Sequence, residues 1–192
     1  MIRSEIIFLL KTSLAYGCLS LGFSFVGLLL PGKNFLPNPL TNGSFSFYEI
    51  LGHILFGLIA GTITLSLRYT LLTGAFAVLI DMDHVVNLLH IEAISRMSHS
   101  ISFGIMALVG MMILFGKKDY RLGSVAFGGM LSHVAYDVYF PGDPGPPFFA
   151  PFTTTHIPLP GLDWLILEVM AIVIIGFCTI VWKKTDKQLV ER

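Results

Sequence analysis

The chain has 192 residues, of which 54% are hydrophobic and only 12% are charged. A soluble globular domain carries about 25% charged residues, so this composition favours a membrane protein. Twelve basic side chains balance twelve acidic ones, and no basic block of the kind that follows a phosphate backbone occurs, which argues against a nucleic-acid partner. Cys18 and Cys178 lie in separate apolar runs, so neither a disulfide nor a cysteine-metal site is indicated.

Six apolar stretches approach the roughly 20 residues that a helix needs to cross the hydrocarbon core of a bilayer. They are residues 12–30, 50–67, 70–89, 98–116, 122–140 and 162–182. The first could be mistaken for a signal peptide, but Glu5 and the lack of a small-residue cleavage site before Pro31 favour a retained span. We therefore expect an all-α, polytopic membrane protein of about six transmembrane helices, with residues 1–192 forming one domain.

Prolines and glycines mark the connections and the close helix contacts. The connections Pro31 to Ser46 and Pro141 to Gly161 are rich in these residues and are expected to be irregular and partly exposed. Glycines inside the second and fifth stretches are expected to let neighbouring helices pack closely. They are Gly52, Gly57, Gly61, Gly123, Gly128 and Gly129.

The distribution of Lys and Arg predicts the orientation, because positive charge is retained on the cytoplasmic side. With the N-terminus inside, ten Lys and Arg residues fall in the inner segments and only Lys33 and Arg96 in the outer ones. This asymmetry and the even number of spans agree. We expect both termini to be cytoplasmic, in the inner (plasma) membrane of the cell.

Side chains of metal-ligand type gather in the outer halves of four predicted helices, and the inner halves of these stretches carry no His, Asp or Glu. At a rise of about 1.5 Å per residue, the set falls within roughly 12 Å of the outer boundary. It comprises His53 in the second stretch, Asp81, Asp83 and His84 in the third, His99 with Ser100 in the fourth, and His133 and Asp137 in the fifth. This pattern predicts a metal site between helices 2 to 5 on the non-cytoplasmic side.

Residue spacing supports that prediction. His133 and Asp137 are four residues apart, and Asp81 and His84 are three apart, so each pair shares a helix face. Glu49, four residues before His53, suits either a second-shell carboxylate that orients the imidazole through its other ring nitrogen or an interfacial charge with no such role. Imidazole and carboxylate without thiolate favour zinc, manganese or ferrous iron. Several aspartates would permit one or two ions.

Simpler structural interpretations compete with these roles. A lone histidine in a membrane is more often a packing residue than a ligand, whereas an intramembrane aspartate costs a few kcal/mol and is by default functional or paired. Glu168 in the sixth stretch fits a ligand, an acid/base group or a packing residue equally well. Arg96 would suit contact with an anionic substrate, although a solvated flank or a headgroup anchor is equally consistent with its position.

Several motifs together resemble a known family. They are Leu79-Ile80-Asp81-Met82-Asp83-His84, then His99-Ser100, then Leu131-Ser132-His133-Val134-Ala135-Tyr136-Asp137, followed by Pro151-Phe152. Over residues 50–152 the chain resembles the YdjM-type inner-membrane metal-dependent hydrolases, and His53 to Gly57 resembles that family's N-terminal His-containing helix. Two positions depart from the pattern: Ile80 stands where proline is usual, and Arg96-Met97-Ser98 replaces an Arg-Gly segment.

A more distant similarity is to zinc-dependent phospholipase C and related single-strand nucleases. It implies that Asp81 or Asp83, His99, His133 and Asp137 form one metal site, with His53 and His84 as candidates for a second. Because this similarity crosses a fold boundary, it raises the expectation of phosphoester chemistry without establishing it.

The leading expectation is a membrane-bound hydrolase that acts on a lipid or lipid-linked phosphoester at the outer leaflet through a metal-activated water. Asp83 or Glu168 would transfer protons, and zinc is the first choice of metal. One alternative is an ion-coupled transporter, although the polar residues stop at mid-membrane. A b-type haem protein would have no use for the aspartates. A metal-binding protein without turnover would have the same sequence pattern.

Overall fold

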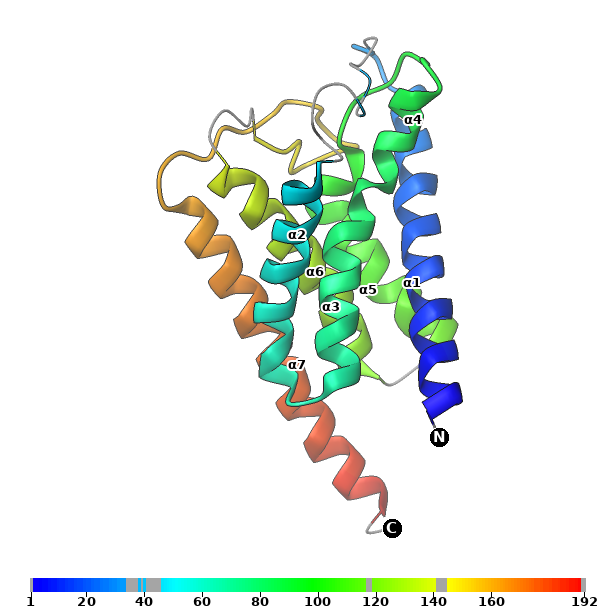
Figure 1. Ribbon diagram of the computed structural model, residues 1–192, viewed down its shortest axis with the longest axis vertical. Coiled ribbons are helices and arrows are strands. Elements are labelled where there is room, and N and C mark those ends of the chain that lie inside the picture. The colour runs from blue at the N-terminus through cyan, green and yellow to red at the C-terminus, as the bar shows by residue number, and fades with distance from the viewer. Residues whose placement is uncertain are drawn as a thin grey trace.

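The computed structural model describes residues 2–33, 38, 40, 46–116, 119–140 and 145–190, and within them it contains helices and no β-strand. The α-helices are α1 (Ile2–Ser24), α2 (Phe47–Gly61), α3 (Leu67–Leu79), α4 (Val85–Leu88), α5 (Ile101–Phe115), α6 (Tyr120–Tyr139) and α7 (Asp163–Val190). The long helices run alternately up and down in one bundle (Figure 1). Both termini lie at one end, and α4 with the connection 145–162 lies at the other (Figure 1).

Short 3-10 segments extend or join several of these helices. They are η1 (Phe25–Leu28), η2 (Thr62–Thr64), η3 (Ile80–His84) and η4 (Met97–His99). All six predicted stretches are helical, which confirms the all-α prediction. Helix α1 begins at Ile2 rather than near residue 12, because residues that bear charge, among them Glu5 and Lys11, continue the helix beyond the apolar run.

Four helical segments of the described chain are long and apolar enough to cross a membrane. They are Arg3–Leu28, Phe47–Thr64, Leu67–Leu88 and Asp163–Thr185. Helix α5 is apolar but has only 15 residues, and α6 has 20 residues but includes serine, histidine and aspartate. The chain is therefore a membrane protein with several apolar helices. The count of six spans and the cytoplasmic termini stay predictions.

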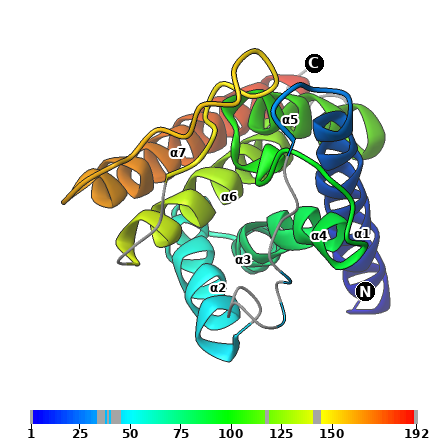
Figure 2. The same ribbon diagram turned by 90° about the horizontal axis from the view of Figure 1, so that it is seen from above.

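Helix α6 is the central element of the bundle. Viewed from above, it runs among α2, α3, α5 and α7, and it packs against all four (Figure 2). Every residue from Leu122 to Asp137 except Phe127 is buried. A helix that is buried on all sides turns its polar side chains toward other helices rather than toward lipid, so α6 is suited to carry a polar site.

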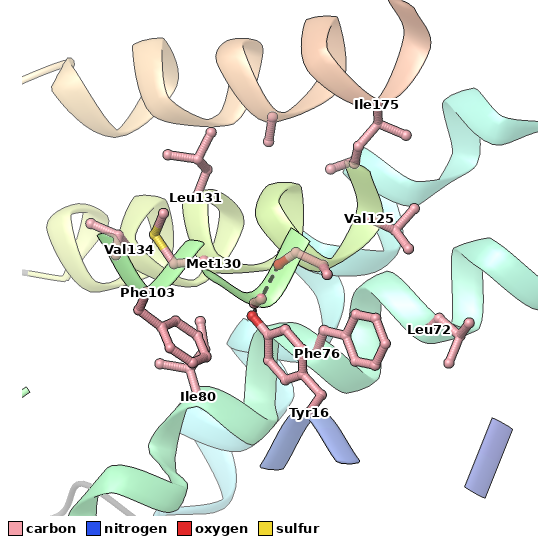
Figure 3. Close-up of a cluster of buried hydrophobic side chains, with 14 of the residues drawn as sticks. Tyr16, Leu72, Phe76, Ile80, Phe103, Val125, Met130, Leu131, Val134 and Ile175 are labelled. Atoms are coloured by element: carbon pink, nitrogen blue, oxygen red, sulfur yellow. Dashed lines mark hydrogen bonds between the residues drawn. The ribbon is translucent and has the colours of Figure 1, made fainter. Parts of the chain in front are cut away.

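An apolar core beneath the polar residues ties α1 to the centre of the bundle. The ring of Tyr16 in α1 stacks on Phe76 in α3 with centroids 4.3 Å apart. The Tyr16 hydroxyl donates a hydrogen bond of 3.0 Å to the carbonyl of Ala126 in α6 (Figure 3). Ile80 belongs to the same core and directly precedes Asp81. Packing of this core thus fixes the point at which the polar segment begins.

Glycines let α2 approach its neighbours closely, as predicted. A Cβ atom on Gly57 would lie 2.6 Å from the carbonyl oxygen of Thr73 and 2.8 Å from Cα of Gly74 in α3. A Cβ atom on Gly52 would lie 2.0 Å from the ring of Tyr136 in α6. Helix α2 therefore contacts the backbone of α3 at Gly57 and the ring of Tyr136 in α6 at Gly52, which brings His53 close to α6.

The second proline-rich connection is irregular, as expected, but it is more buried than expected. Pro146, Pro147, Phe148 and Ala150 are buried, whereas Phe152 is 88% exposed. The carbonyl of Phe148 accepts a hydrogen bond of 3.0 Å from the amide of Ile101 at the start of α5. Most of the first connection, 31–46, lies outside the described residues.

We expect Gly57→Ala to lower the thermal stability of the purified protein. The added methyl group would press on the backbone of α3, and such overpacking costs about 1–3 kcal/mol. Thermal unfolding in detergent, followed by circular dichroism, measures the effect. Gly22→Ala is the matched control, because a Cβ atom at that position has no heavy atom within 4 Å. Equal melting temperatures for the two variants would contradict the close packing of α2 on α3.

Candidate metal centre

Distant parts of the chain bring five buried ligand-type side chains together: His53 from α2, Asp81 from η3, His99 from η4, and His133 and Asp137 from α6. Each is at most 9% exposed. The segments that carry them are the first half of α2, the ends of α3 and α6, and the start of α5. They lie in the part of the bundle farther from the two termini (Figure 1).

His133 lies at the centre of this cluster. Its Nε2 atom is 2.8 Å from Nε2 of His99, and it is 3.5 Å from Oδ1 of Asp81 and 3.4 Å from Oδ2 of Asp137. The ring of His53 stacks on the ring of His133 with centroids 3.8 Å apart. Nε2 of His53 is 3.7 Å from Asp81 and 3.5 Å from Asp137. Imidazole nitrogens and carboxylate oxygens thus converge on one small region.

The partners of the other ring nitrogens fix the tautomers of His99 and His133. Nδ1 of His133 lies 2.6 Å from the carbonyl oxygen of Ala77, which can only accept, so this nitrogen carries the proton. Nδ1 of His99 likewise faces the carboxylate of Asp83 at 3.1 Å. The two Nε2 atoms then face each other, and either a proton on one of them or a metal cation beside them satisfies the pair.

The donors fit a divalent cation. Three groups of described residues have ligand atoms close enough together to hold a metal ion, and neighbouring groups share His133 or Asp81. The groups are His53, His133 and Asp137; Asp81, His99 and His133; and Asp81, Asp83 and His84. Imidazole and carboxylate are common zinc ligands, with bond lengths of about 2.0–2.2 Å, so small movements of these side chains would bring them into coordination.

A change of helix winding positions Asp81 and His84. We expected an α-helix through residue 89, but the α-helix ends at Leu79 and continues as the 3-10 segment η3. In a 3-10 helix, residues three apart eclipse each other, and Nε2 of His84 lies 3.3 Å from Oδ1 of Asp81. Ser20 of α1 donates a hydrogen bond of 2.6 Å to the carbonyl of Ile80 at this change of winding.

Asp83 lies behind His99 rather than at the centre of the cluster. Its Oδ2 atom accepts hydrogen bonds from His99 Nδ1 at 3.1 Å and from the Ser98 hydroxyl at 2.8 Å. This contact makes Asp83 a positioning residue for His99, in the carboxylate-histidine arrangement that metal sites commonly use. Sequence reasoning missed Ser98. Ser100, predicted as a second-shell residue, is the N-cap of α5 and accepts from the amide of Phe103.

Glu49 and Arg96 border the cluster. Glu49 was expected to orient His53 through the ring nitrogen that faces away from a metal. Instead, Oε2 of Glu49 lies 3.8 Å from Nε2, the nitrogen that faces the cluster, while Nδ1 of His53 has no hydrogen-bond partner. Arg96 adopts a left-handed backbone conformation, with φ of 57°. Its guanidinium pairs with the carboxylate of Asp137.

Glu168 stands apart from the cluster. Its buried carboxylate in α7 faces Ser132 of α6, and neither side chain makes a hydrogen bond of good geometry. Ser132 and His133 are consecutive, so their side chains leave α6 about 100° apart. Among the described residues, no hydrogen bond or ion pair joins Glu168 to the His/Asp cluster. Its catalytic role stays a prediction without a contact to support it.

Comparison with known proteins identifies the family. The family model for the YdjM inner membrane protein matches residues 49–191, well over half of the chain. The match begins at Glu49 and includes every residue of the cluster. No curated protein and no solved structure matches the chain, and the similarity to zinc-dependent phospholipase C stays a prediction. On the strength of the family match, the chain belongs to the YdjM family of inner membrane proteins.

Proposed function

We propose that this protein is a membrane-bound, metal-dependent hydrolase that acts on a lipid or lipid-linked phosphoester at the outer leaflet. The observation that carries the proposal is the approach of His99 and His133, whose Nε2 atoms lie 2.8 Å apart. The carboxylates of Asp81 and Asp137 adjoin the same two nitrogens. This concentration of carboxylates and imidazole nitrogens supports the binding of a metal cation.

Zinc is the first candidate for that cation, with manganese or iron as alternatives. His53, Asp81, His99, His133 and Asp137 would hold it, with His84 beside Asp81. When bound, an ion of this kind lowers the pKa of water toward neutrality and polarises a phosphoester. The chain contributes an oriented set of ligands, because the Ala77 carbonyl and Asp83 hold the two central rings.

The place of the cluster supports a substrate from the membrane. It lies away from the end of the bundle that holds the termini (Figure 1), and the distribution of positive charge assigns that end to the cytoplasm. The cluster would then lie near headgroup depth in the outer leaflet. Arg96, which pairs with Asp137 at the border of the cluster, would bind the anionic phosphoester once an ion neutralises that carboxylate.

Glu49 is the carboxylate best placed to transfer protons. Its side chain is 22% exposed and lies 3.8 Å from Nε2 of His53, so it contacts both the surroundings and the cluster. Asp83 is occupied in orienting His99, and Glu168 faces Ser132 instead. We therefore favour Glu49 over the two carboxylates suggested by the sequence as the general acid or base.

Replacement of His133 and Asp137 by alanine is expected to abolish both metal binding and turnover, because it removes the central ligands. Plasma mass spectrometry of detergent-purified protein measures metal content, and a screen of lipid phosphoesters measures turnover. His90→Asn is the matched control, since His90 is exposed, at a positive φ that asparagine tolerates. Absence of metal in the wild type after reconstitution with zinc, manganese and iron would refute the proposal. If the protein binds metal but hydrolyses none of the phosphoesters, the metal site stands and the proposed hydrolase activity on phosphoesters is refuted.

Arg96→Gln should raise KM for the anionic substrate by about tenfold or more, while metal content is retained. The physical reason is that a bound cation takes over the neutralisation of Asp137, leaving Arg96 to the substrate. Steady-state kinetics and metal analysis separate the two effects, and Arg96→Lys, which keeps the charge, should partly restore KM. Weaker metal binding in Arg96→Gln, with KM unchanged at saturating metal, would show that Arg96 acts through Asp137 alone.

Glu49→Gln should lower kcat by roughly 10²–10⁴-fold, the usual contribution of general acid-base catalysis, with metal affinity unchanged. Asp83→Asn should instead weaken metal affinity by about 10–100-fold, as is typical for loss of a carboxylate that orients a ligand. Metal titration and kinetics on the two variants distinguish these roles. The reverse pattern would return the proton-transfer role to Asp83.

A further inference from the structure

Asp81 faces imidazoles from four different segments of the chain. Its Oδ1 atom lies 3.5 Å from Nε2 of His133, 3.9 Å from Nε2 of His99 and 3.3 Å from Nε2 of His84. Its Oδ2 atom lies 3.7 Å from Nε2 of His53. His84 is separate from the central rings, since its ring centroid is 6.0 Å from that of His99. Asp81 therefore stands between two sets of ligands.

Asp83 supplies a second, independent observation on the His84 side. One of its oxygens, Oδ2, is satisfied by His99 and Ser98. The other, Oδ1, is buried and has no hydrogen-bond partner, and it lies 3.8 Å from Nδ1 of His84. The residue is 4% exposed. A buried carboxylate oxygen without a partner is costly, and a cation between Asp83, Asp81 and His84 would remove that cost.

The balance of charge also favours more than one ion. The carboxylates of Asp81, Asp83, Asp137 and Glu49 adjoin the cluster, and Arg96 is the cation paired with one of them. One divalent ion leaves this set negative, which would repel an anionic phosphoester. A second divalent ion makes the set positive, and positive charge in a low-dielectric site attracts an anion strongly.

We propose that the cluster binds two divalent cations, with Asp81 as the ligand that bridges them. His53, His99, His133 and Asp137 hold the first ion, and Asp83 with His84 holds the second. This inference rests on the proposed metal-dependent function and deepens it, because two-ion centres are typical of enzymes that cleave phosphoesters. The second ion exchanges more readily, since the side chain of His84 is 14% exposed whereas those of His99 and His133 are at most 1% exposed.

The test is the metal stoichiometry of the full-length, detergent-purified protein after loading with manganese and removal of excess ion. We expect two equivalents in the wild type and in the His90→Asn control, and one equivalent in His84→Ala. Electron paramagnetic resonance gives an independent readout: the wild type should show the signal of a spin-coupled manganese pair, and His84→Ala the signal of isolated Mn²⁺. His84→Asn, which retains a polar side chain, repeats the experiment if the alanine variant unfolds.

Three results would overturn the two-ion assignment. Saturation of the wild type at one equivalent would exclude the second ion while leaving a metal-dependent hydrolase intact. Two equivalents in both His84 variants would mean that His84 is not a ligand. Loss of both ions from folded His84 variants, judged by size-exclusion chromatography and circular dichroism, would mean that the ligands form a single site. Absence of any metal from the wild type would instead refute the proposed function itself.

Discussion

Burial of several carboxylates and imidazoles in a low-dielectric interior is the constraint on which the end of the bundle away from the termini depends. The Nε2 atoms of His99 and His133 face each other within a set of carboxylates, and each ring is held there by the partner of its Nδ1 atom. Arg96 balances only part of the negative charge. Packing of α2, α3 and α6 through glycines and aromatic rings holds these buried carboxylates close together against their mutual repulsion.

Much of the fold could be predicted from the sequence, because a bilayer ties the length of an apolar run to the length of a helix. The six stretches are all helical. The change of winding at Ile80 could not be predicted, because the Ser20 hydroxyl that binds its carbonyl comes from a position 60 residues earlier. The start of α1 was also misplaced, since hydropathy does not report where a helix continues beyond the apolar run.

The membership of the site was easier to predict than its arrangement. Histidine and aspartate at one depth in several apolar helices must meet in the packed interior, and the structure brings them together. Tertiary partners decide which nitrogen of a histidine ring faces the cluster. Glu49 therefore lies near Nε2 of His53, the nitrogen that faces the cluster, and not near the opposite nitrogen as predicted. No local pattern could reveal the Ala77 carbonyl, the Ser98 hydroxyl or the pairing of Arg96 with Asp137.

The hydrogen bond from Tyr16 to Ala126 joins residues that are 110 positions apart. The central ligands on α6 come from the same late part of the chain. During synthesis, α1 therefore enters the membrane long before its partner exists, and the aspartates of η3 follow before His133 can meet them. The nascent chain must carry these aspartates without their final neighbours, so the His/Asp cluster is assembled only after five of the long helices have been made. Assembly of the cluster is then a late event in biogenesis, coupled to the docking of α6 rather than to the insertion of any single helix.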